Sequence, residues 1–282
     1  MRTLTRTRRQ LVREKVQHVQ RIQKAPEDAN IKIDSVISDV MGTSGRRILR
    51  ALIAGERDPE KLVEVTTGRL RASRETLVEA LRGYVTKHHR FLLKLHLDQV
   101  QAIEQAIASV EEEVGESLKP FRERADLLTT IPGIDATVAH VIVAEIGVNM
   151  SRFPTAAHLR SWAGFCPRND QSAGKRRSNR IRKGAPWLKT VLVQAAWAAV
   201  HTKGTYLRAQ FFRLRARRGP KKAIVAVAAS ILTAAYHILR DGVPNRDLGP
   251  DHFDQIGKAK LIRRLVNKLD ELGCKVEIKE AA

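Results

Sequence analysis

Apolar residues along this chain are spaced as in a mainly α-helical protein. They recur at intervals of three and four, the period of a helix that buries one face. Helices are predicted over residues 136–146, 156–164, 186–201, 205–217 and 221–239. Strand patterns are weak, with one short candidate at 275–278. The apolar run at 223–239 is shorter than a typical membrane span and contains polar residues, so we expect a buried helix.

A long helix is predicted between residues 76 and 124. It carries an a/d seam of about three heptads, with His96 at one d position. The seam consists of Leu93, Val100, Ile103, Ile107, Val110 and Val114. It fits either a helix packed on its own domain or a coiled coil that joins protomers through residues 90–116. We expect Gly115 and Pro120 to end this helix.

A tight turn at residues 131–134 joins two further helices. Gly133 can take the positive φ of such a turn, and Asp135 suits the N-cap of the next helix. The turn resembles a helix-hairpin-helix, which aims free backbone N–H groups at a DNA phosphate. An ordinary turn between two core helices is the alternative. The charge of the chain favours phosphate contacts at Pro132 and Gly133.

The charge distribution calls for a polyanionic partner. The chain has 282 residues, enough for about two domains, and a formal net charge of +21. Sixteen Lys and Arg residues lie between Arg168 and Lys222, against the single acid Asp170. A second basic stretch runs from Arg2 to Lys24. Nucleic acid is the partner that such a surplus on a foldable chain favours.

Other residue types exclude several classes of protein and site. Two cysteines, Cys166 and Cys274, exclude a disulfide scaffold or cysteine-based zinc site and fit a reducing cytoplasm. The N-terminus has no apolar segment typical of a secretory signal. We therefore expect a cytoplasmic protein without membrane contact. His88, His89 and His96 lack further ligands at metal-binding spacing, so we expect no metal site.

Aromatic residues in the second half of the chain are predicted to be core. The prediction covers Trp162, Trp187, Trp197 and the Phe211–Phe212 pair. For Trp187, beside the basic segment, stacking on a nucleic-acid base is the alternative.

The segment at residues 167–184 is predicted to be a polar loop dense in cations, and it contains Ser172 and Ser178. Arg and Lys side chains can neutralise a phosphodiester under attack by a serine, although no general base stands nearby. A loop that clamps phosphates without chemistry is the alternative. We predict nucleic-acid contacts at Gly174, Lys175, Arg176, Arg177, Arg180, Arg182, Lys183, Arg215, Arg217, Arg218, Lys221 and Lys222.

Three blocks in order resemble the C-terminal domain of the insertion-sequence transposases of the one-hundred-and-ten family, relatives of the Piv-type DNA invertases. The blocks read LLTTIPGIDATVAHVIVAEIG, FPTAAHLRSWAGFCPRNDQSAGKRR and RKGAPWLKTVLVQAAWAA, and the tail DGVPNRDLGPDHF fits as well. The first part of the chain is similar to the region between the two catalytic halves of that family.

The resemblance implies a recombinase that cuts and rejoins DNA, guided by a structured non-coding RNA. It implies a serine nucleophile, which here corresponds to Ser172, with Ser178 as second choice, and it gives Gly174 and Lys175 a role in shaping the loop and holding phosphate. An N-terminal resolvase-like domain of four acids would hold Mg²⁺. No acid before residue 61 ends an apolar strand, so we expect that domain to be missing, no cofactor in this chain, and negligible cleavage by this chain alone.

These expectations divide the chain into four parts: a basic helical linker (1–75), a long helix or coiled coil (76–124), a transposase domain with the hairpin turn and serine loop (125–250) and a tail (251–282). The leading hypothesis is the DNA- and RNA-binding, serine-bearing part of a transposase. A non-catalytic nucleic-acid-binding protein, or regulator of a full-length transposase, is the second. A ribosome-associated or RNA-packaging protein would explain the charge but not the order of the blocks.

Overall fold

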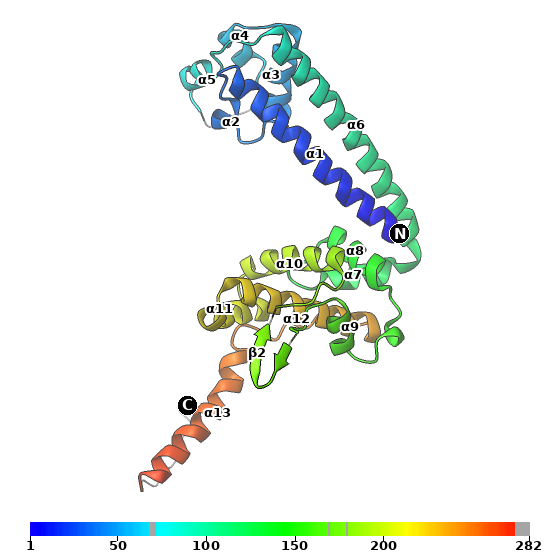
Figure 1. Cartoon of the computed structure of the whole chain (residues 1–282), viewed down its shortest axis with the longest axis vertical. Helices are drawn as coiled ribbons and strands as arrows, with labels where there is room; N and C mark the ends of the chain where they lie inside the picture. The colour runs from blue at the N-terminus through cyan, green and yellow to red at the C-terminus, as the bar shows by residue number, and fades with distance from the viewer. Residues whose placement is uncertain (68–71, 169, 179, 274–282) are drawn as a thin grey trace. The chain divides into compact units, whose positions relative to one another are not determined.

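The computed structural model describes residues 1–67, 72–168, 170–178 and 180–273. It consists almost entirely of helices, which confirms the mainly α prediction (Figure 1). The chain forms two compact units: an N-terminal unit, Thr3–Glu116, and a C-terminal unit, Ser117–Ala282 with Met1–Arg2. The predicted divisions at 75 and 125 are finer than these units and stay predictions. The strand predicted at 275–278 and Cys274 lie outside the described residues.

Two long helices and four short ones build the N-terminal unit. In chain order they are α1 (Arg2–Asp28), α2 (Ile33–Val36), α3 (Thr43–Ala54), α4 (Pro59–Glu64), α5 (Arg74–Ala80) and α6 (Lys87–Leu118). A hydrophobic core joins the end of α1 to the short helices and to the start of α6, with Ile22, Leu49 and Leu93 among its fully buried residues.

The long helices α1 and α6 pair side by side in opposite directions (Figure 1). Arg8 contacts Glu111 at 2.6 Å, Lys15 contacts Glu104 at 2.8 Å, and His18 meets His96, so rising numbers on α1 match falling numbers on α6. The predicted seam therefore packs inside its own unit. Leu93, Val100, Ile103 and Val114 are buried there. Oligomerisation through residues 90–116 stays a prediction.

The end predicted for the long helix at Gly115 is wrong. Helix α6 continues through Gly115 to Leu118 and is followed by the 3-10 turn Lys119–Phe121. Val114 and Leu118 are both buried and lie one helical turn apart on one face. Burial of that face outweighs the cost of about 1 kcal/mol for a glycine inside a helix. Pro120 lies in the 3-10 turn, just beyond the end of α6.

The C-terminal unit is built around α12 (Pro220–Asp241), which packs against α7, α9, α10 and α11. The surrounding elements are α7 (Arg122–Thr129), α8 (Ala136–Ile146), a 3-10 turn (Met150–Arg152), α9 (Ala156–Trp162), β1 (Asp170–Ser172), β2 (Lys175–Ser178), α10 (Pro186–His201), α11 (Tyr206–Arg218) and α13 (His252–Glu271). Local signals end these helices: Asp135 caps α8 by accepting the Val138 N–H, and Gly147 closes it.

Helix α12 confirms the predicted buried helix at 223–239. Ala223, Val227, Ile231 and Ala235 are fully buried, at intervals of four. Within the described residues it is the one helix long and apolar enough, by length and composition, to cross a membrane, and 56% of its most apolar window is buried in the fold. A core helix passes the same test.

The aromatic residues divide differently from the prediction. Trp162 and Trp197 are 44% and 43% exposed, and Phe212 is 44% exposed while Phe211 is buried. Trp197 lies edge-on to Phe211 at 5.7 Å, and Phe212 lies under the guanidinium of Arg208 at 4.9 Å. The core prediction therefore holds for Phe211 and is wrong for Trp162, Trp197 and Phe212, because helix spacing alone does not tell which side a neighbouring helix covers.

Candidate nucleic-acid interface and serine site

The predicted polar loop is a β-hairpin, so the loop prediction is wrong. Strands β1 and β2 pair antiparallel, with Ser172 opposite Lys175 and Asp170 opposite Ser178. Below them Pro167 bridges to Ile181, and the Arg168 N–H donates to the Arg180 carbonyl at 3.1 Å. We call residues 167–184 the basic hairpin. The sequence did not predict these strands because neither has the alternating apolar residues by which a strand is recognised.

The tip of the basic hairpin is a two-residue turn of Ala173 and Gly174. Both residues have positive φ, 49° and 74°, as the two central residues of a type I′ turn require. Glycine adopts this conformation freely, whereas an alanine there carries about 1 kcal/mol of strain. The turn places Ser172 and Lys175 at the end of the hairpin, exposed to solvent.

Two glycines hold the base of the basic hairpin against the rest of the unit. Gly164 precedes the hairpin and Gly184 ends it, and each has a positive φ. A Cβ on either glycine would clash with the backbone at the opposite end of the hairpin. On Gly164 it would meet the Arg182 carbonyl and Gly184, and on Gly184 it would meet Ala163 and Gly164. Only glycine permits this approach. The sequence reasoning missed this contact, although both glycines flank the basic segment.

Lys189, in the first turns of α10, fastens the returning arm of the basic hairpin. Its Nζ donates to the carbonyl oxygens of Arg182 at 2.5 Å and Lys183 at 2.7 Å. Burial lowers the pKa of its ammonium from the ordinary lysine value. Lys189, which is half-buried, therefore holds the backbone of two exposed cations of the basic hairpin, a role that sequence reasoning did not find.

The two candidate serines have different surroundings. Ser172 is exposed at the tip, and none of the hydrogen bonds between described residues involves its hydroxyl. Ser178 is half-buried, and its Oγ accepts the backbone N–H of Arg180 at 3.2 Å. A nucleophile must reach its target from an open position, so the geometry favours Ser172.

The cations of the basic hairpin face the solvent. Arg168 pairs loosely with Asp170, at 4.0 Å. The predicted contacts on the hairpin whose side chains the structure describes are all exposed: Lys175, Arg177, Arg180, Arg182 and Lys183. Arg176 belongs to β2, and its side chain lies outside the described part. The hairpin is thus a strongly cationic surface with Asp170 as its one acid in sequence, and such a surface attracts phosphates.

A second basic surface lies where α11 meets α12. Arg215, Arg217 and Arg218 end α11, and Lys221 and Lys222 begin α12. All five side chains are exposed, and none forms an ion pair with another described residue. No hydrogen bond or ion pair found in the described ranges joins this surface to the basic hairpin.

The turn at residues 131–134 has the predicted conformation but faces the protein. Gly133 has a φ of 84°, and a Cβ there would meet the backbone of Ala195 and Ala199 in α10. The carboxylate of Asp135 already accepts an N–H at the start of α8. Gly133 therefore allows helix packing, and phosphate contact at Pro132 and Gly133 stays a prediction.

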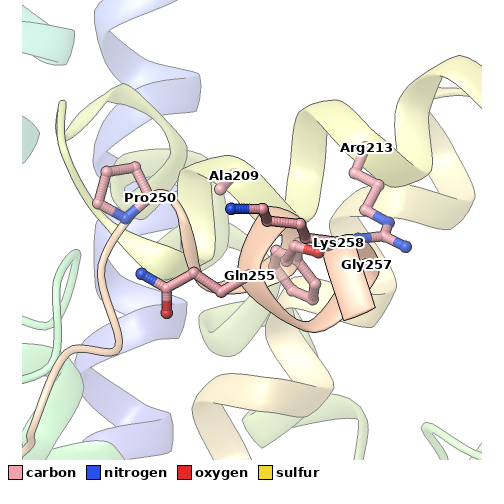
Figure 2. A pocket seen from close by; sticks show the side chains of 7 residues that line it. Ala209, Arg213, Pro250, Gln255, Gly257 and Lys258 are labelled. Atoms are coloured by element: carbon pink, nitrogen blue, oxygen red, sulfur yellow. Dashed lines mark hydrogen bonds between the residues drawn. The ribbon is translucent and has the colours of Figure 1, made fainter. Parts of the chain in front are cut away.

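A shallow pocket of about 690 Å³ lies between α11 and the start of α13. Figure 2 shows Pro250 and Gln255 on one side and Arg213 on the other. Its walls are formed by Ala209, Arg213, Pro250, Phe253, Gln255, Gly257 and Lys258. The Arg213 guanidinium lies over the Phe253 ring at 5.1 Å and donates to its carbonyl. Arg213 thus holds α13 in place.

The described residues do not form a metal site. Among them no group of three or more His, Cys, Asp or Glu side chains could hold an ion. His18 and His96 approach to 3.2 Å between their Nδ1 atoms, without a third ligand. The Mg²⁺ implied by the resemblance does not fit any cluster in this part of the chain.

Part of the C-terminal unit is similar to a family of transposases. Residues 125–211, which run from α7 into α11 and include the basic hairpin, match the model of the Transposase IS116/IS110/IS902 family. The resemblance inferred from the sequence is thereby confirmed for this part of the chain.

Curated relatives agree with this match. The pilin gene-inverting proteins of Moraxella bovis and Moraxella lacunata are each 35% identical, over 130 and 127 residues. An uncharacterised 43.6 kDa protein of insertion element IS110 from Streptomyces coelicolor is 31% identical over 118 residues. The matches cover 44%, 43% and 41% of this chain, but only 39%, 38% and 29% of the relatives. The matched part of the chain therefore spans less than half the length of each relative.

Proposed function

We propose that this chain acts in DNA transposition or site-specific recombination, and that its C-terminal unit binds DNA and supplies Ser172 as nucleophile. The observation that carries the proposal is the coincidence of the family match with an exposed serine at the tip of a cationic hairpin. The Moraxella relatives are named as proteins that invert a pilin gene, which is a recombination reaction.

The proposed step is a transesterification. The Ser172 Oγ attacks a backbone phosphorus, a serine–phosphate bond forms, and one P–O bond to deoxyribose breaks. The serine proton ends on the released hydroxyl, so rejoining is the same step in reverse. Lys175 and Arg177 neutralise the charge that grows on the phosphate. Because no cluster of the described residues fits Mg²⁺, we assign no step to a metal.

The RNA partner is part of the proposal. Two separate basic surfaces, the basic hairpin and the α11–α12 joint, can hold two nucleic-acid strands at once. Phosphate contacts carry no sequence information, so a guide RNA that pairs with DNA would supply the choice of site.

A covalent adduct tests the role of Ser172. The chain is incubated with a nicked DNA substrate that traps the intermediate, Mg²⁺ and the acidic resolvase-like domain of a family member. We expect an adduct with the unaltered chain and with Ser178→Ala, and none with Ser172→Ala. Loss of the adduct in Ser178→Ala alone would transfer the role to Ser178.

The second candidate is a DNA- and RNA-binding protein or regulator without catalysis. One observation favours it: among the described side chains no His, Asp or Glu hydrogen-bonds the Ser172 hydroxyl, so no base activates it. Under this function the chain binds DNA in the same assay, forms no adduct under any condition, and lowers the activity of a full-length transposase added with it.

A further inference from the structure

Two exposed aromatic side chains lie on neighbouring helices of the C-terminal unit. Trp197 of α10 is 43% exposed, and Phe212 of α11 is 44% exposed. The buried Phe211 connects them, because its ring centroid lies 5.7 Å from that of Trp197 and 5.4 Å from that of Phe212. Helices α10 and α11 pack against each other, so the two exposed rings belong to one surface.

Two guanidinium groups lie over the Phe212 ring. The Cζ of Arg208 is 4.9 Å from the ring centroid, and the Cζ of Arg215 is 5.8 Å from it. Arg208 also donates to the Val200 carbonyl at 2.8 Å, which holds its guanidinium in place. Arg215 is one of the five cations of the α11–α12 joint. We call Trp197, Arg208, Phe212 and Arg215 the aromatic platform.

The charge around the aromatic platform indicates what it binds. From Pro186 to Lys222 the sequence has nine Lys and Arg residues and no Asp or Glu. Flat side chains beside such a surplus of cations suit a ligand that is itself planar and negatively charged. A nucleotide of a single strand has both features, a base that stacks and a phosphate. In a duplex the base faces are stacked on one another and cannot reach the platform.

We propose that the aromatic platform binds unpaired bases of single-stranded DNA. The bases stack on the Trp197 indole and on the planar guanidiniums that Phe212 orders, while the cations of the α11–α12 joint contact the phosphates. The inference rests on the proposed function, since a guide RNA that pairs with one DNA strand leaves the other strand unpaired. It gives the second basic surface a ligand different from the duplex at the basic hairpin.

An abasic strand separates stacking from charge, because it keeps every phosphate and lacks the bases. Fluorescence anisotropy compares an oligodeoxyadenylate with an abasic strand of the same length, each titrated with the nuclease-treated full chain. We expect the strand with bases to bind about tenfold more tightly, the size of one stacked base. Equal affinity of the unaltered chain for the two strands would overturn the proposal.

Leucine variants locate the stacking. Trp197→Leu and Phe212→Leu keep an apolar side chain beside Phe211 but lose the aromatic surface, so each should remove most of the preference for bases. Trp197→Phe should retain it. The matched control is Phe91→Leu, which changes an aromatic residue of α6 that is 64% exposed and should leave the preference unchanged. A preference that survives both leucine variants of the platform would overturn the proposal.

A charge variant shows the opposite pattern. Arg217→Ala with Arg218→Ala removes two exposed cations of the joint and should weaken both strands by the same factor, since both carry the same phosphates. Circular dichroism verifies that each variant keeps its helix content. If the charge variant abolished the preference for bases instead, that preference would not come from the platform, and the proposal would be overturned.

Two further titrations identify the source of the bases. An RNA strand of the same sequence that bound on the order of tenfold more tightly than DNA would assign the platform to RNA and overturn the proposal. Duplex DNA is titrated in parallel. Absence of binding to duplex and single strands alike would overturn the proposed function together with this inference, whereas duplex binding with equal affinity for the two single strands would overturn this inference alone.

Discussion

At the scale of single residues, the basic hairpin depends on two unusual positions. Ala173 has a φ of 49° at the tip, beside the candidate nucleophile. Lys189 lies outside the hairpin and holds two of its carbonyl groups. Backbone strain that the surrounding structure maintains is common at functional sites. Both residues therefore act on the position of Ser172 and its cations rather than on the core.

Ala173→Gly should relax the turn. Glycine removes the left-handed strain, so we expect opening of the hairpin to cost about 1 kcal/mol more, reduced in part by the entropy of glycine. Hydrogen exchange of the Arg168 N–H, which donates to the Arg180 carbonyl, reports this opening. Ala216→Gly on the exposed face of α11 is the control and should not slow that exchange. Faster exchange in Ala173→Gly would contradict the assigned strain.

Lys189→Met should weaken DNA binding with the fold intact. Methionine keeps an extended, unbranched side chain but loses the donors to Arg182 and Lys183, so the returning arm is no longer held. We expect Kd for duplex DNA to rise roughly tenfold, from the loss of hydrogen bonds made by a charged donor. Lys203→Met removes one exposed lysine of the same unit and is the control. If Lys189→Met and Lys203→Met raised Kd equally, Lys189 would contribute only as a surface charge, and its positioning role would be contradicted.

At the scale of elements, the α1–α6 pair is polar as well as apolar. Burial and the neighbours His18 and Arg21 lower the pKa of His96 below 6.5. Burial opposes the ionisation of Glu104, but hydrogen bonds from Lys15 and Arg46 outweigh it and lower its pKa. The pairing of the two helices is therefore sensitive to the protonation of His96.

Acidification should destabilise the N-terminal unit. The pKa of His96 is lower in the folded state than in the unfolded chain. Near the ordinary histidine pKa of about 6.5, the unfolded chain therefore binds more protons than the folded chain. Stability then falls as pH decreases through that range. Between about pH 7.5 and 5.5, the midpoint temperature of thermal unfolding should fall less in His96→Gln than in the unaltered chain. His88→Gln, at an exposed position of the same helix, should not change the slope.

The basic hairpin acts as one electrostatic element. The double variant Arg177→Ala with Arg180→Ala should make the salt dependence shallower. The magnitude of the slope of log K against log salt should decrease by about two units, since each removed phosphate contact changes it by about one. Fluorescence anisotropy with duplex DNA measures the slope. Arg82→Ala, which removes a cation paired with Glu79 in the N-terminal unit, should leave it unchanged. An unaltered slope in the double variant would exclude the hairpin from the interface.

At the scale of the whole molecule, the two units use charge differently. In the N-terminal unit Arg8, Lys15 and Arg46 pair with acids of α6. In the C-terminal unit the cations of the basic hairpin and the α11–α12 joint stand exposed, with Asp170 as their one acidic neighbour in sequence. Nucleic-acid binding should therefore reside mainly in the C-terminal unit.

The affinity of the full chain for DNA should depend steeply on salt. With about six phosphates neutralised, we expect a decrease on the order of a thousandfold between 50 and 200 mM salt. Anisotropy titrations at several salt concentrations measure it. A flat response would count against both candidate functions, since each relies on phosphate contacts.

The sequence by itself determined five helices of the C-terminal unit, α8 to α12, and the sign of its surface, whereas α13 lies in a segment predicted only as a tail. Helices α8 and α10 have the predicted bounds, because a helix is set by residues within one or two turns, such as the cap Asp135 and the leading Pro186. The exposure of these cations could be predicted from the sequence, since burying an unpaired charge costs too much free energy. The family match follows from the same local blocks.

Only the tertiary structure decided which surfaces meet. Three contacts join residues that are separated in the chain. Gly164 meets Gly184, Lys189 hydrogen-bonds the Arg182 carbonyl, and α1 pairs with α6. The strands of the basic hairpin, without an apolar face, form because their ends are held together at the base. The exposure of Trp162 and Trp197 was equally undetermined by spacing. Burial depends on what packs against a face, and that is a property of the folded chain.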